Sequence, residues 1–431
     1  MRIHILGISG TFMAGIAILA KQKGPIVTGS DKNFFDPIRS VLIKNKIKVF
    51  ENYNPENLNR KIYLVIVGNV MSRGMPIIEK LLDSKIKYIS GPQWLKENIL
   101  VNKRVIAVSG THGKTTVSSL VTHILKFNKL NPSYLIGGLP IGFKKPANLT
   151  KSEYFVIEAD EYDTAFFDKR SKFLHYKPEI LIINNIEFDH ADIFNNIDDI
   201  LKNFHQLLRI MPKKGHVIYN HSDKNILELL CQGIWSKLAA LKKNHWQNPK
   251  IKTKLLGTHN FKNIAISLIA CRKISLPIKK ILNAIESFRG VKRRMEHVGC
   301  FKNINIYDDF AHHPTEILSS IKSMKNTKNL GNQKNRVLSI CQIRSNSMIR
   351  GTHTPELYKA LEVSDYSIIH HDVKLKGQFK NNKFKNINVF TKDSDILNYI
   401  KKLKKEIDTI LIMSNGNTSK FIELIKHVIQ K

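Results

Sequence analysis

Short runs of aliphatic and β-branched residues alternate with longer amphipathic segments along most of the chain. Near the start, Phe12–Lys23 predicts a helix, and four apolar runs predict strands at Arg2–Leu6, Pro25–Thr28, Leu64–Val67 and Tyr88–Ile89. Short apolar runs bounded by turn residues are typical of strands that are buried between helices. The pattern therefore predicts a small parallel α/β unit at the start of the chain.

Two further series of the same kind follow. The second is predicted to contain a helix that ends near Phe127 and strands at Arg104–Ser109, Tyr154–Ile157 and Ile180–Asn184. The third is predicted to contain strands at Ile304–Tyr307, Val337–Cys341, Tyr366–His370 and Ile410–Met413. The polar segments Lys242–Lys254 and Lys376–Asn386 predict a loop and an exposed turn. Repeated strand–helix alternation favours parallel sheets that are covered by helices.

Length and composition fit a packed protein of two or three domains. A chain of 431 residues exceeds one ordinary domain, and 42% hydrophobic residues suffice for packed cores. No apolar run approaches the ~18 residues that a membrane span requires. The four cysteines are scattered and form no CxxC pair, which argues against a zinc ribbon or a disulfide framework. This usage predicts a cytoplasmic, reducing location.

The chain is strongly basic, with 69 Lys and Arg against 35 Asp and Glu and a net charge of +34. An excess of this size attracts anions, and nucleic acid is one candidate. The lysines, however, are spread over the whole chain and are not interleaved with aromatic residues in a recognition motif. We therefore expect solvated basic surfaces and no nucleic-acid partner, while small anionic substrates would still benefit.

The segment after Arg104–Ser109 has the chemistry of a phosphate-binding loop. It reads Gly110, Thr111, His112, Gly113, Lys114, Thr115 and Thr116, with a helix predicted to follow. Small residues let backbone N–H groups approach phosphate oxygens, and the start of the helix adds partial positive charge. Lys114 would reach the outer phosphates, and the Thr115 hydroxyl would hold Mg²⁺. The first glycine of a Walker A loop would fall at Val108, so the loop is a variant.

Acidic and polar residues follow the next two predicted strands. Glu158, Asp160 and Glu161 come after one strand, and Asp189 and His190 after the other. Because ligands bind at the carboxyl ends of parallel strands, an acid there can hold the Mg²⁺ that bridges ATP phosphates. A histidine ligand is unusual for Mg²⁺, and a histidine such as His190, taken alone, is more often a surface or hydrogen-bonding side chain than a ligand. Its position beside the other strand ends favours a role in the site.

A second glycine turn lies near the start of the chain. Gly7, Gly10 and Gly15 fall between a predicted strand and helix, and Asp31 follows the second strand. This layout resembles a dinucleotide-binding unit, but the GxxG spacing is a weak match to the NAD pattern. A diphosphate or nucleotide site is the better interpretation, and glycines that serve only a tight turn are the alternative.

Four further polar groups are candidate ligand contacts. Asn260 and Asn263 could cap a helix or contact adenine, and Arg294 could face phosphate or lie in a solvated loop. Asp309 with His312 could form a metal site, but a nucleotide or substrate contact is better supported, and Arg344 with Asn346 could bind a substrate carboxylate.

Together and in this order, the motifs resemble those of the Mur ligases, the ATP-dependent amide-forming family of peptidoglycan assembly. The resemblance rests on the Gly110–Thr116 loop, Glu158–Glu161, Asp189–His190, Gly257–Asn263 and Asp309–Pro314, and it covers essentially the whole chain. It implies an α/β fold of three domains. These are a Rossmann-like UDP-sugar domain at 1–102, a central ATP-binding domain at 103–295 with a P-loop ATPase-like parallel sheet, and a Rossmann-like ligase domain at 296–431.

The resemblance also implies roles for individual residues. It makes Lys114, Glu158 and His190 catalytic, with Thr115, Glu158 and His190 holding Mg²⁺. The ATP contacts would be the Gly110–Thr116 loop, Asn260 and Asn263 at adenine, Arg294 at the phosphates and Asp309 at the ribose. The UDP sugar would be held by Gly10, Thr11, Asp31, Asn69 and Arg73, and the acceptor peptide by His312, Arg344 and Asn346.

Several long stretches are most similar to the branch of the family that recycles cell-wall tripeptide, among them Gly68–Gly74 and Glu158–Lys172. The implied reaction joins UDP-N-acetylmuramate to L-alanyl-γ-D-glutamyl-meso-diaminopimelate, and the implied protein is a monomer or a weak oligomer. The L-alanine-adding sibling usually has Ser in place of Tyr162. That sibling, or a nucleotide-binding relative without catalysis, remains the alternative. Gln342-Ile343 and Asn417–Lys420 depart from the family pattern and put peptide specificity in question.

Overall fold

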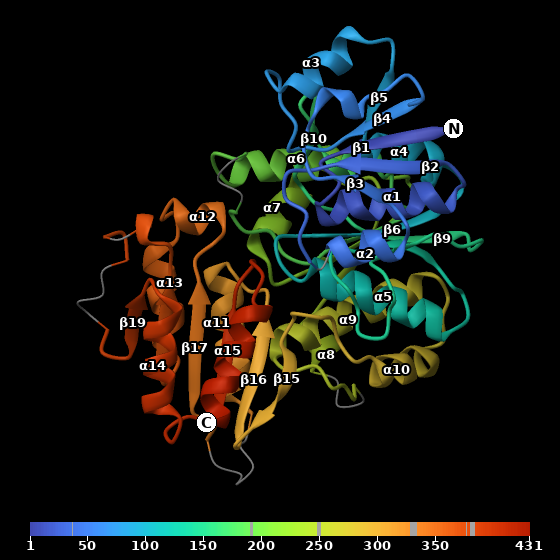
Figure 1. Cartoon of the computed structure of the whole chain (residues 1–431). Coiled ribbons are helices and arrows are strands. Elements are labelled where there is room, and N and C mark those ends of the chain that lie inside the picture. The colour runs from blue at the N-terminus through green and yellow to red at the C-terminus, as the bar shows by residue number, and fades with distance from the viewer. Residues whose placement is uncertain (37, 190–192, 248–250, 328–333, 376, 380–383) are drawn as a thin grey trace. The chain divides into compact units, whose positions relative to one another are not determined.

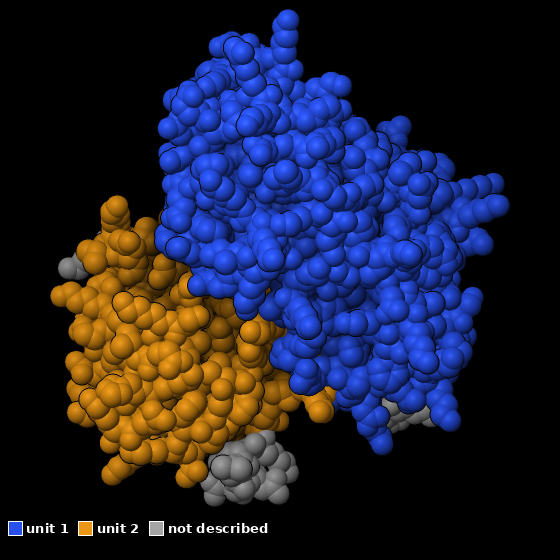
Figure 2. Space-filling model, turned by 45° about the vertical axis from the view of Figure 1, so that its right-hand side comes forward, with its two compact units in different colours: residues 1–188, 196–253, 263–289 blue, residues 189–195, 254–262, 290–431 orange. Residues whose placement is uncertain are grey.

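The computed structural model describes residues 1–431 except 37, 190–192, 248–250, 328–333, 376 and 380–383. The described residues form two compact units (Figure 2). Unit 1 comprises residues 1–188, 196–253 and 263–289, and unit 2 comprises residues 189–195, 254–262 and 290–431. Within the described ranges, unit 1 contains a five-stranded and a seven-stranded sheet with a small hairpin, and unit 2 contains a six-stranded sheet.

The first sheet of unit 1 has the order β3-β2-β1-β4-β5, and all of its neighbouring strands are parallel (Figure 1). Its strands are β1 (Arg2–Leu6), β2 (Ile26–Ser30), β3 (Lys48–Phe50), β4 (Leu64–Val67) and β5 (Lys87–Ser90). The helices are α1 (Thr11–Gln22), α2 (Ile38–Lys44), α3 (Pro76–Asp83) and α4 (Gly91–Asn98), with short 3₁₀ turns η1 (Pro55–Asn57) and η2 (Leu100–Asn102). The strand order reverses between β1 and β4, where sheets of this kind bind ligands.

The second sheet of unit 1 has the order β14-β13-β12-β6-β9-β7-β8. Its strands are β6 (Arg104–Ser109), β7 (Ser133–Leu135), β8 (Ala147–Asn148), β9 (Tyr154–Glu158), β12 (Ile180–Ile183), β13 (His216–Asn220) and β14 (Lys237–Leu241). The helices are α5 (Lys114–Phe127), α6 (Ile197–Arg209), α7 (Lys224–Cys231), α8 (Lys243–Trp246), α9 (Thr258–Lys273) and α10 (Ile278–Ser287). A hairpin of β10 (Asp163–Ala165) and β11 (Asp168–Ser171) leads into η3 (Lys172–His175). The first residues of α9 belong to unit 2.

The sheet of unit 2 has the order β15-β16-β20-β17-β18-β19. Its strands are β15 (Glu296–Phe301), β16 (Ile304–Asp309), β17 (Val337–Gln342), β18 (Tyr366–His370), β19 (Ile387–Phe390) and β20 (Thr409–Met413). The helices are α11 (Pro314–Lys325), α12 (Asn346–Ile349), α13 (Thr354–Glu362), α14 (Asp393–Leu403) and α15 (Ser419–Gln430), with a short turn η4 (Val373–Leu375).

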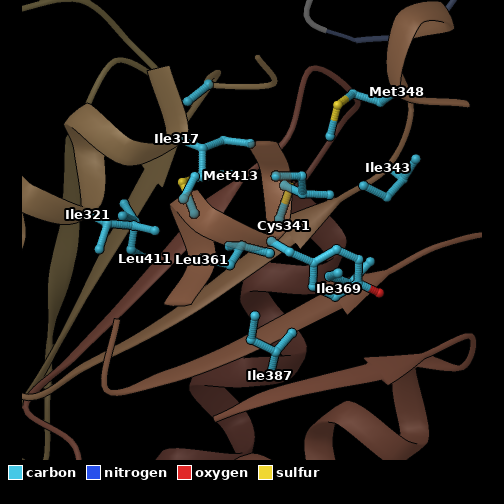
Figure 3. Close-up of a cluster of buried hydrophobic side chains, with 14 of the residues drawn as sticks. Ile317, Ile321, Cys341, Ile343, Met348, Leu361, Ile369, Ile387, Leu411 and Met413 are labelled. Carbon is cyan, nitrogen blue, oxygen red and sulfur yellow. The ribbon is translucent and has the colours of Figure 1, made fainter. Parts of the chain in front are cut away.

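Helices cover both faces of this sheet. Cys341 of β17 packs in one buried cluster with Ile317 of α11 and Leu361 of α13 (Figure 3). Its neighbour Ile340 packs in a second buried cluster with Ile425 of α15. Successive side chains of a strand point to opposite faces, so a strand that is buried on both faces is mostly apolar and does not alternate. This explains why β17 is apolar except at Ser339 and its last residue, Gln342.

The α/β architecture with parallel-dominated sheets confirms the predicted fold class, and several predicted strands have the expected bounds. Three strand pairs, β7–β8, β10–β11 and β15–β16, are antiparallel, and each contains at least one strand that the sequence pattern did not predict. The predicted loop at Lys242–Lys254 contains the short helix α8, and its residues 248–250 lie outside the described residues. The domain boundaries at 102 and 295 stay predictions. In the described part of the chain, no helix is long and apolar enough to cross a membrane.

Candidate active site

Two glycines shape the loop that joins β6 to α5. Gly110 has φ +125°, and a Cβ there would come within 2.7 Å of the Asn185 carbonyl oxygen. Gly113, the N-cap of α5, has φ +80°, and a Cβ there would come within 2.6 Å of Asn184 Nδ2. Only glycine fits both the backbone angles and the space. No side chain caps the start of α5, so its first N–H groups face the loop.

Two asparagines at the end of β12 hold the loop in place. His112 N donates to Asn185 Oδ1 at 2.7 Å, and Thr111 N donates to the Asn185 carbonyl at 3.0 Å. Asn184 Nδ2 donates to the His112 carbonyl at 2.9 Å. β12 is the parallel neighbour of β6, so both loops start at the same edge of the sheet. The sequence pattern does not predict this role, and its only signal is the position of the asparagines after an apolar strand.

Lys114 lies among backbone oxygens and acidic side chains. Its Nζ donates to the Gly110 carbonyl at 2.7 Å and to Glu161 Oε2 at 3.3 Å, and Asp160 Oδ1 is 3.9 Å away. The side chain is 12% exposed. Burial alone would lower the pKa of Lys114, but Glu161, Asp160 and Glu158 together raise it above its ordinary value. The ammonium is therefore charged and can bind phosphate oxygens.

Thr115 and Glu158 meet beside this lysine. Thr115 Oγ1 donates to Glu158 Oε1 at 2.9 Å, and Gly137 N donates to Glu158 Oε2 at 2.6 Å. A hydroxyl and a carboxylate are hard oxygen ligands of the kind that Mg²⁺ prefers, so the pair fits this ion. Thr116, the next residue of α5, is buried. His190, the third predicted metal ligand, lies outside the described residues.

Asp31 holds the backbone of the first glycine turn in place through hydrogen bonds. Its carboxylate accepts hydrogen bonds from Ser9 N at 2.8 Å, Asn33 N at 3.2 Å and Tyr53 Oη at 3.2 Å. Burial and the Asp31 charge raise the pKa of Tyr53 above its ordinary value, so the phenol stays protonated and donates. Asp31 thus fixes the turn before Gly10, the N-cap of α1, and most of its acceptor capacity is used within the protein.

The other residues that are predicted to hold the UDP sugar lie in exposed loops beside the same sheet or at the start of α1. Thr11 opens α1, and Asn69 follows β4 in an exposed loop. Arg73 is exposed and forms a two-pronged pair with Glu79, with Nε and Nη2 at 3.1 and 3.0 Å from the carboxylate oxygens. The Arg73 guanidinium is therefore already paired in this structure.

In unit 2, Asp309 ends β16 and is buried. Its carboxylate accepts hydrogen bonds from Ser320 Oγ at 2.5 Å and from Ala311 N at 3.4 Å. Burial raises the pKa of Asp309 to about 6. Arg294 Nη1 lies 3.5 Å from Glu316 Oε1, at the start of α11.

The two asparagines of α9 are both buried and both engaged. Asn260 Nδ2 donates to the Leu256 carbonyl at 2.7 Å, within unit 2. Asn263 Oδ1 accepts from Asn184 Nδ2 at 2.9 Å, within unit 1. Asn263 therefore supports the Gly113 end of the phosphate loop, a role that its cap-like spacing did not predict.

The predicted acceptor residues lie after β16 and β17. His312 Nδ1 is 3.0 Å from the Phe310 carbonyl oxygen, and Arg344 and Asn346 are exposed. A Cβ on Gly416 would overlap the Arg344 side chain, so the two segments are in close contact. Among the described residues, the buried Oε1 of Gln342 has no hydrogen-bond partner. Arg344 follows β17 and Gly416 follows β20, and these two strands are parallel neighbours in the sheet.

Three family models match successive parts of the chain. They are described as Mur ligase family, catalytic domain (residues 2–102), Mur ligase middle domain (108–235) and Mur ligase, glutamate ligase domain (293–416). The matches follow the order of the three large sheets.

Individual relatives agree with the models. The UDP-N-acetylmuramate–L-alanyl-γ-D-glutamyl-meso-2,6-diaminoheptandioate ligase of Escherichia coli strain K12 is 39% identical over 96% of this chain and 95% of its own. The UDP-N-acetylmuramate–L-alanine ligase of Clostridium acetobutylicum is 28% identical over 98% of this chain and 97% of its own. The crystal structure of a murein peptide ligase from Psychrobacter arcticus 273-4 superposes with a TM-score of 0.75 at 32% identity, covering 100% of this chain and 99% of that one. The chain therefore belongs to the Mur ligase family of ATP-dependent, amide-forming ligases.

Proposed function

We propose that this enzyme joins the carboxylate of UDP-N-acetylmuramate to the amine of L-alanyl-γ-D-glutamyl-meso-diaminopimelate and converts ATP to ADP and phosphate. The observation that carries the choice of substrates is the 39% identity to a tripeptide ligase over almost the whole of both chains. The L-alanine ligase relatives reach 28–29%.

The chemistry follows from the poor electrophilicity of a carboxylate. A donor carboxylate oxygen attacks the γ-phosphorus of ATP, so a P–O bond forms and the bond to ADP breaks. The neutral amine of the tripeptide then attacks the acyl carbon, and phosphate leaves with the oxygen that came from the donor. The amine loses a proton as the amide forms.

The residues of unit 1 suit the first step. We propose that Lys114 neutralises the charge that develops on the transferred phosphoryl group, and that the Gly110–Thr116 loop holds the phosphates with its backbone N–H groups. Thr115 and Glu158 would hold Mg²⁺, with His190 as a further ligand, and the bound ion would supply additional charge neutralisation. Positioning of the two reactants accounts for much of the remaining acceleration.

The nucleotide and acceptor contacts are proposals of the same kind. Asn260 and Asn263 would lie at adenine, Arg294 at the phosphates and Asp309 at the ribose. Gly10, Thr11, Asp31, Asn69 and Arg73 would line the donor site, and His312, Arg344 and Asn346 the acceptor site. The four cysteines are free thiols, which supports a reducing cytoplasmic location for this chemistry.

Isotope transfer tests the reaction class. The donor is prepared with ¹⁸O in its carboxylate and incubated with Mg²⁺, ATP and tripeptide. Mass spectrometry should find one ¹⁸O in the released phosphate and none in ADP. Unlabelled phosphate formed together with amide product would contradict an acyl phosphate route.

A further inference from the structure

Lys172, a buried lysine of unit 1, has no part in the reaction as described above. It begins η3, directly after the β10–β11 hairpin, and is 8% exposed. Its Nζ donates to Asp160 Oδ2 at 3.2 Å, and its backbone N donates to the Tyr162 carbonyl at 2.9 Å. A lysine is seldom buried to this degree unless its charge is matched, so its surroundings call for an explanation.

Two aromatic rings hold the ammonium in place. Nζ lies 5.6 Å from the centre of the Phe12 ring and 5.4 Å from the centre of the Tyr162 ring. Both distances are within the range of a cation–π interaction, which is stronger when the cation is shielded from water. The rings fix the direction of the lysine side chain, but they accept no conventional hydrogen bond from it.

The position of Lys172 links two candidate sites. Phe12 follows Thr11 in the first turn of α1, next to the glycine turn that is proposed to hold the donor diphosphate. Asp160, the ion-pair partner of Lys172, also lies 3.9 Å from the Nζ of Lys114 in the phosphate loop. Lys172 is thus next to the start of α1 on one side and to the ATP-loop carboxylates on the other.

The hydrogen-bonding capacity of this ammonium is not filled. An ammonium has three N–H donors. In the ranges that the structure describes, Asp160 is the one residue that accepts a hydrogen bond from Nζ. Two donors of a shielded cation are therefore left for a ligand, and the ligand that such a group favours is an anionic oxygen.

We infer that Lys172 is a further donor-binding residue, which takes a phosphate or carboxylate oxygen of the UDP sugar. The inference rests on the proposed function. Its competitor is a purely structural role, in which Lys172 only holds Asp160 beside Lys114.

Two variants separate these roles. Lys172→Met removes the charge and every donor, whereas Lys172→Gln removes the charge but keeps an amide that can donate to Asp160, which protects the fold. Lys169→Met is the matched control, because Lys169 lies on the hairpin that directly precedes Lys172, is largely exposed and pairs with Asp163. Calorimetry measures the binding of UDP-N-acetylmuramate and of a non-hydrolysable ATP analogue to each full-length protein.

We expect both Lys172 variants to weaken UDP-N-acetylmuramate binding at least tenfold, while the control and the affinity for the ATP analogue stay within about threefold of wild type. Donor affinity that is unchanged in both variants would overturn the inference, as would a loss confined to the ATP analogue. A wild-type protein that does not bind UDP-N-acetylmuramate would instead contradict the proposed function.

A further arm identifies the anionic group. UDP-N-acetylglucosamine carries the diphosphate but lacks the carboxylate. If Lys172→Met weakens this ligand as strongly as UDP-N-acetylmuramate, the contact is with the diphosphate. If only UDP-N-acetylmuramate is affected, the contact is with the carboxylate. Both results support the inference, and they differ in which group of the UDP sugar Lys172 contacts.

Discussion

Thr115 Oγ1 and Glu158 Oε1 are 2.9 Å apart although the two residues are 43 positions apart in the sequence. The pairing of strands explains the contact. β6 and β9 are parallel neighbours with Val108 opposite Glu158, so the carboxylate at the end of β9 lies beside the loop that follows β6. The hydroxyl and carboxylate form the proposed Mg²⁺ site because the sheet brings their strand ends together.

Replacement of Thr115 by valine should weaken the response to Mg²⁺. The change keeps the shape of the side chain and removes the hydroxyl, so the apparent Mg²⁺ affinity should fall by roughly tenfold to a hundredfold. Turnover measured against Mg²⁺ concentration provides the value. Thr115→Ser keeps the hydroxyl and should stay close to wild type. An unchanged Mg²⁺ dependence in Thr115→Val would rule out this ligand.

Replacement of Lys114 by alanine should lower kcat by about a hundredfold to a thousandfold, because the charge on the transferred phosphoryl group loses its partner. The variant also leaves Glu161, which is 2% exposed, without the Lys114 contact, so circular dichroism must show that the protein is folded. Lys126→Ala, at the exposed end of the same helix, is the control and should retain full activity. Wild-type turnover in folded Lys114→Ala would contradict the loop assignment.

Asp309 should make the free energy of unfolding depend on pH. Burial raises its pKa from 3.8 to about 6, so between these values the folded chain binds more protons than the unfolded chain. The free energy of unfolding should therefore fall by about 3 kcal/mol as the pH rises from about 4 to about 6, and this contribution should then stay constant.

Asp309→Asn should remove this dependence, since an amide oxygen can still accept from Ser320 and does not ionise. Urea titrations at pH 4 and pH 7 test the difference. Far-UV circular dichroism is the suitable probe, because Trp94, Trp235 and Trp246 all lie in unit 1 and do not report on unit 2. Equal pH dependence in the two proteins would show that Asp309 is not the group responsible.

Arg344→Ala should raise the KM for the tripeptide about tenfold and leave the KM for ATP within about twofold, because an exposed guanidinium can pair with a substrate carboxylate. Arg336→Ala is the matched control, since Arg336 precedes β17 and Arg344 follows it. Steady-state kinetics with each substrate varied in turn measure both constants. A rise in the ATP constant alone would place Arg344 outside the acceptor site.

The sequence was sufficient for features whose chemistry is local. The phosphate loop was predictable because its glycines, lysine and threonines are consecutive, and β17 because its apolar run reflects burial on both faces. Strands such as β15 were missed, because its side chains are partly exposed and its apolar pattern is weak. The antiparallel pairings could not be inferred from strand patterns that specify no partner.

Long-range contacts could not be predicted from the sequence alone. Asn184 and Asn185 hold the phosphate loop only because β12 pairs with β6 in one particular register. The contact between Phe12 and Lys172 joins two parts of unit 1 that no motif connects. Asp31 is predicted to line the UDP-sugar site, and its hydrogen bonds with Ser9, Asn33 and Tyr53 of the protein itself could not be foreseen. The roles of the predicted site residues, His190 included, stay predictions.

The most direct test of the central claim is the mass of the product that the purified protein makes from UDP-N-acetylmuramate and Mg-ATP. Parallel reactions contain the tripeptide, L-alanine or no acceptor. We expect an amide product of UDP-N-acetylmuramate and tripeptide, formed together with one ADP and one phosphate per product and much faster than any L-alanine adduct. Product from L-alanine alone, or no product from either acceptor, would contradict it.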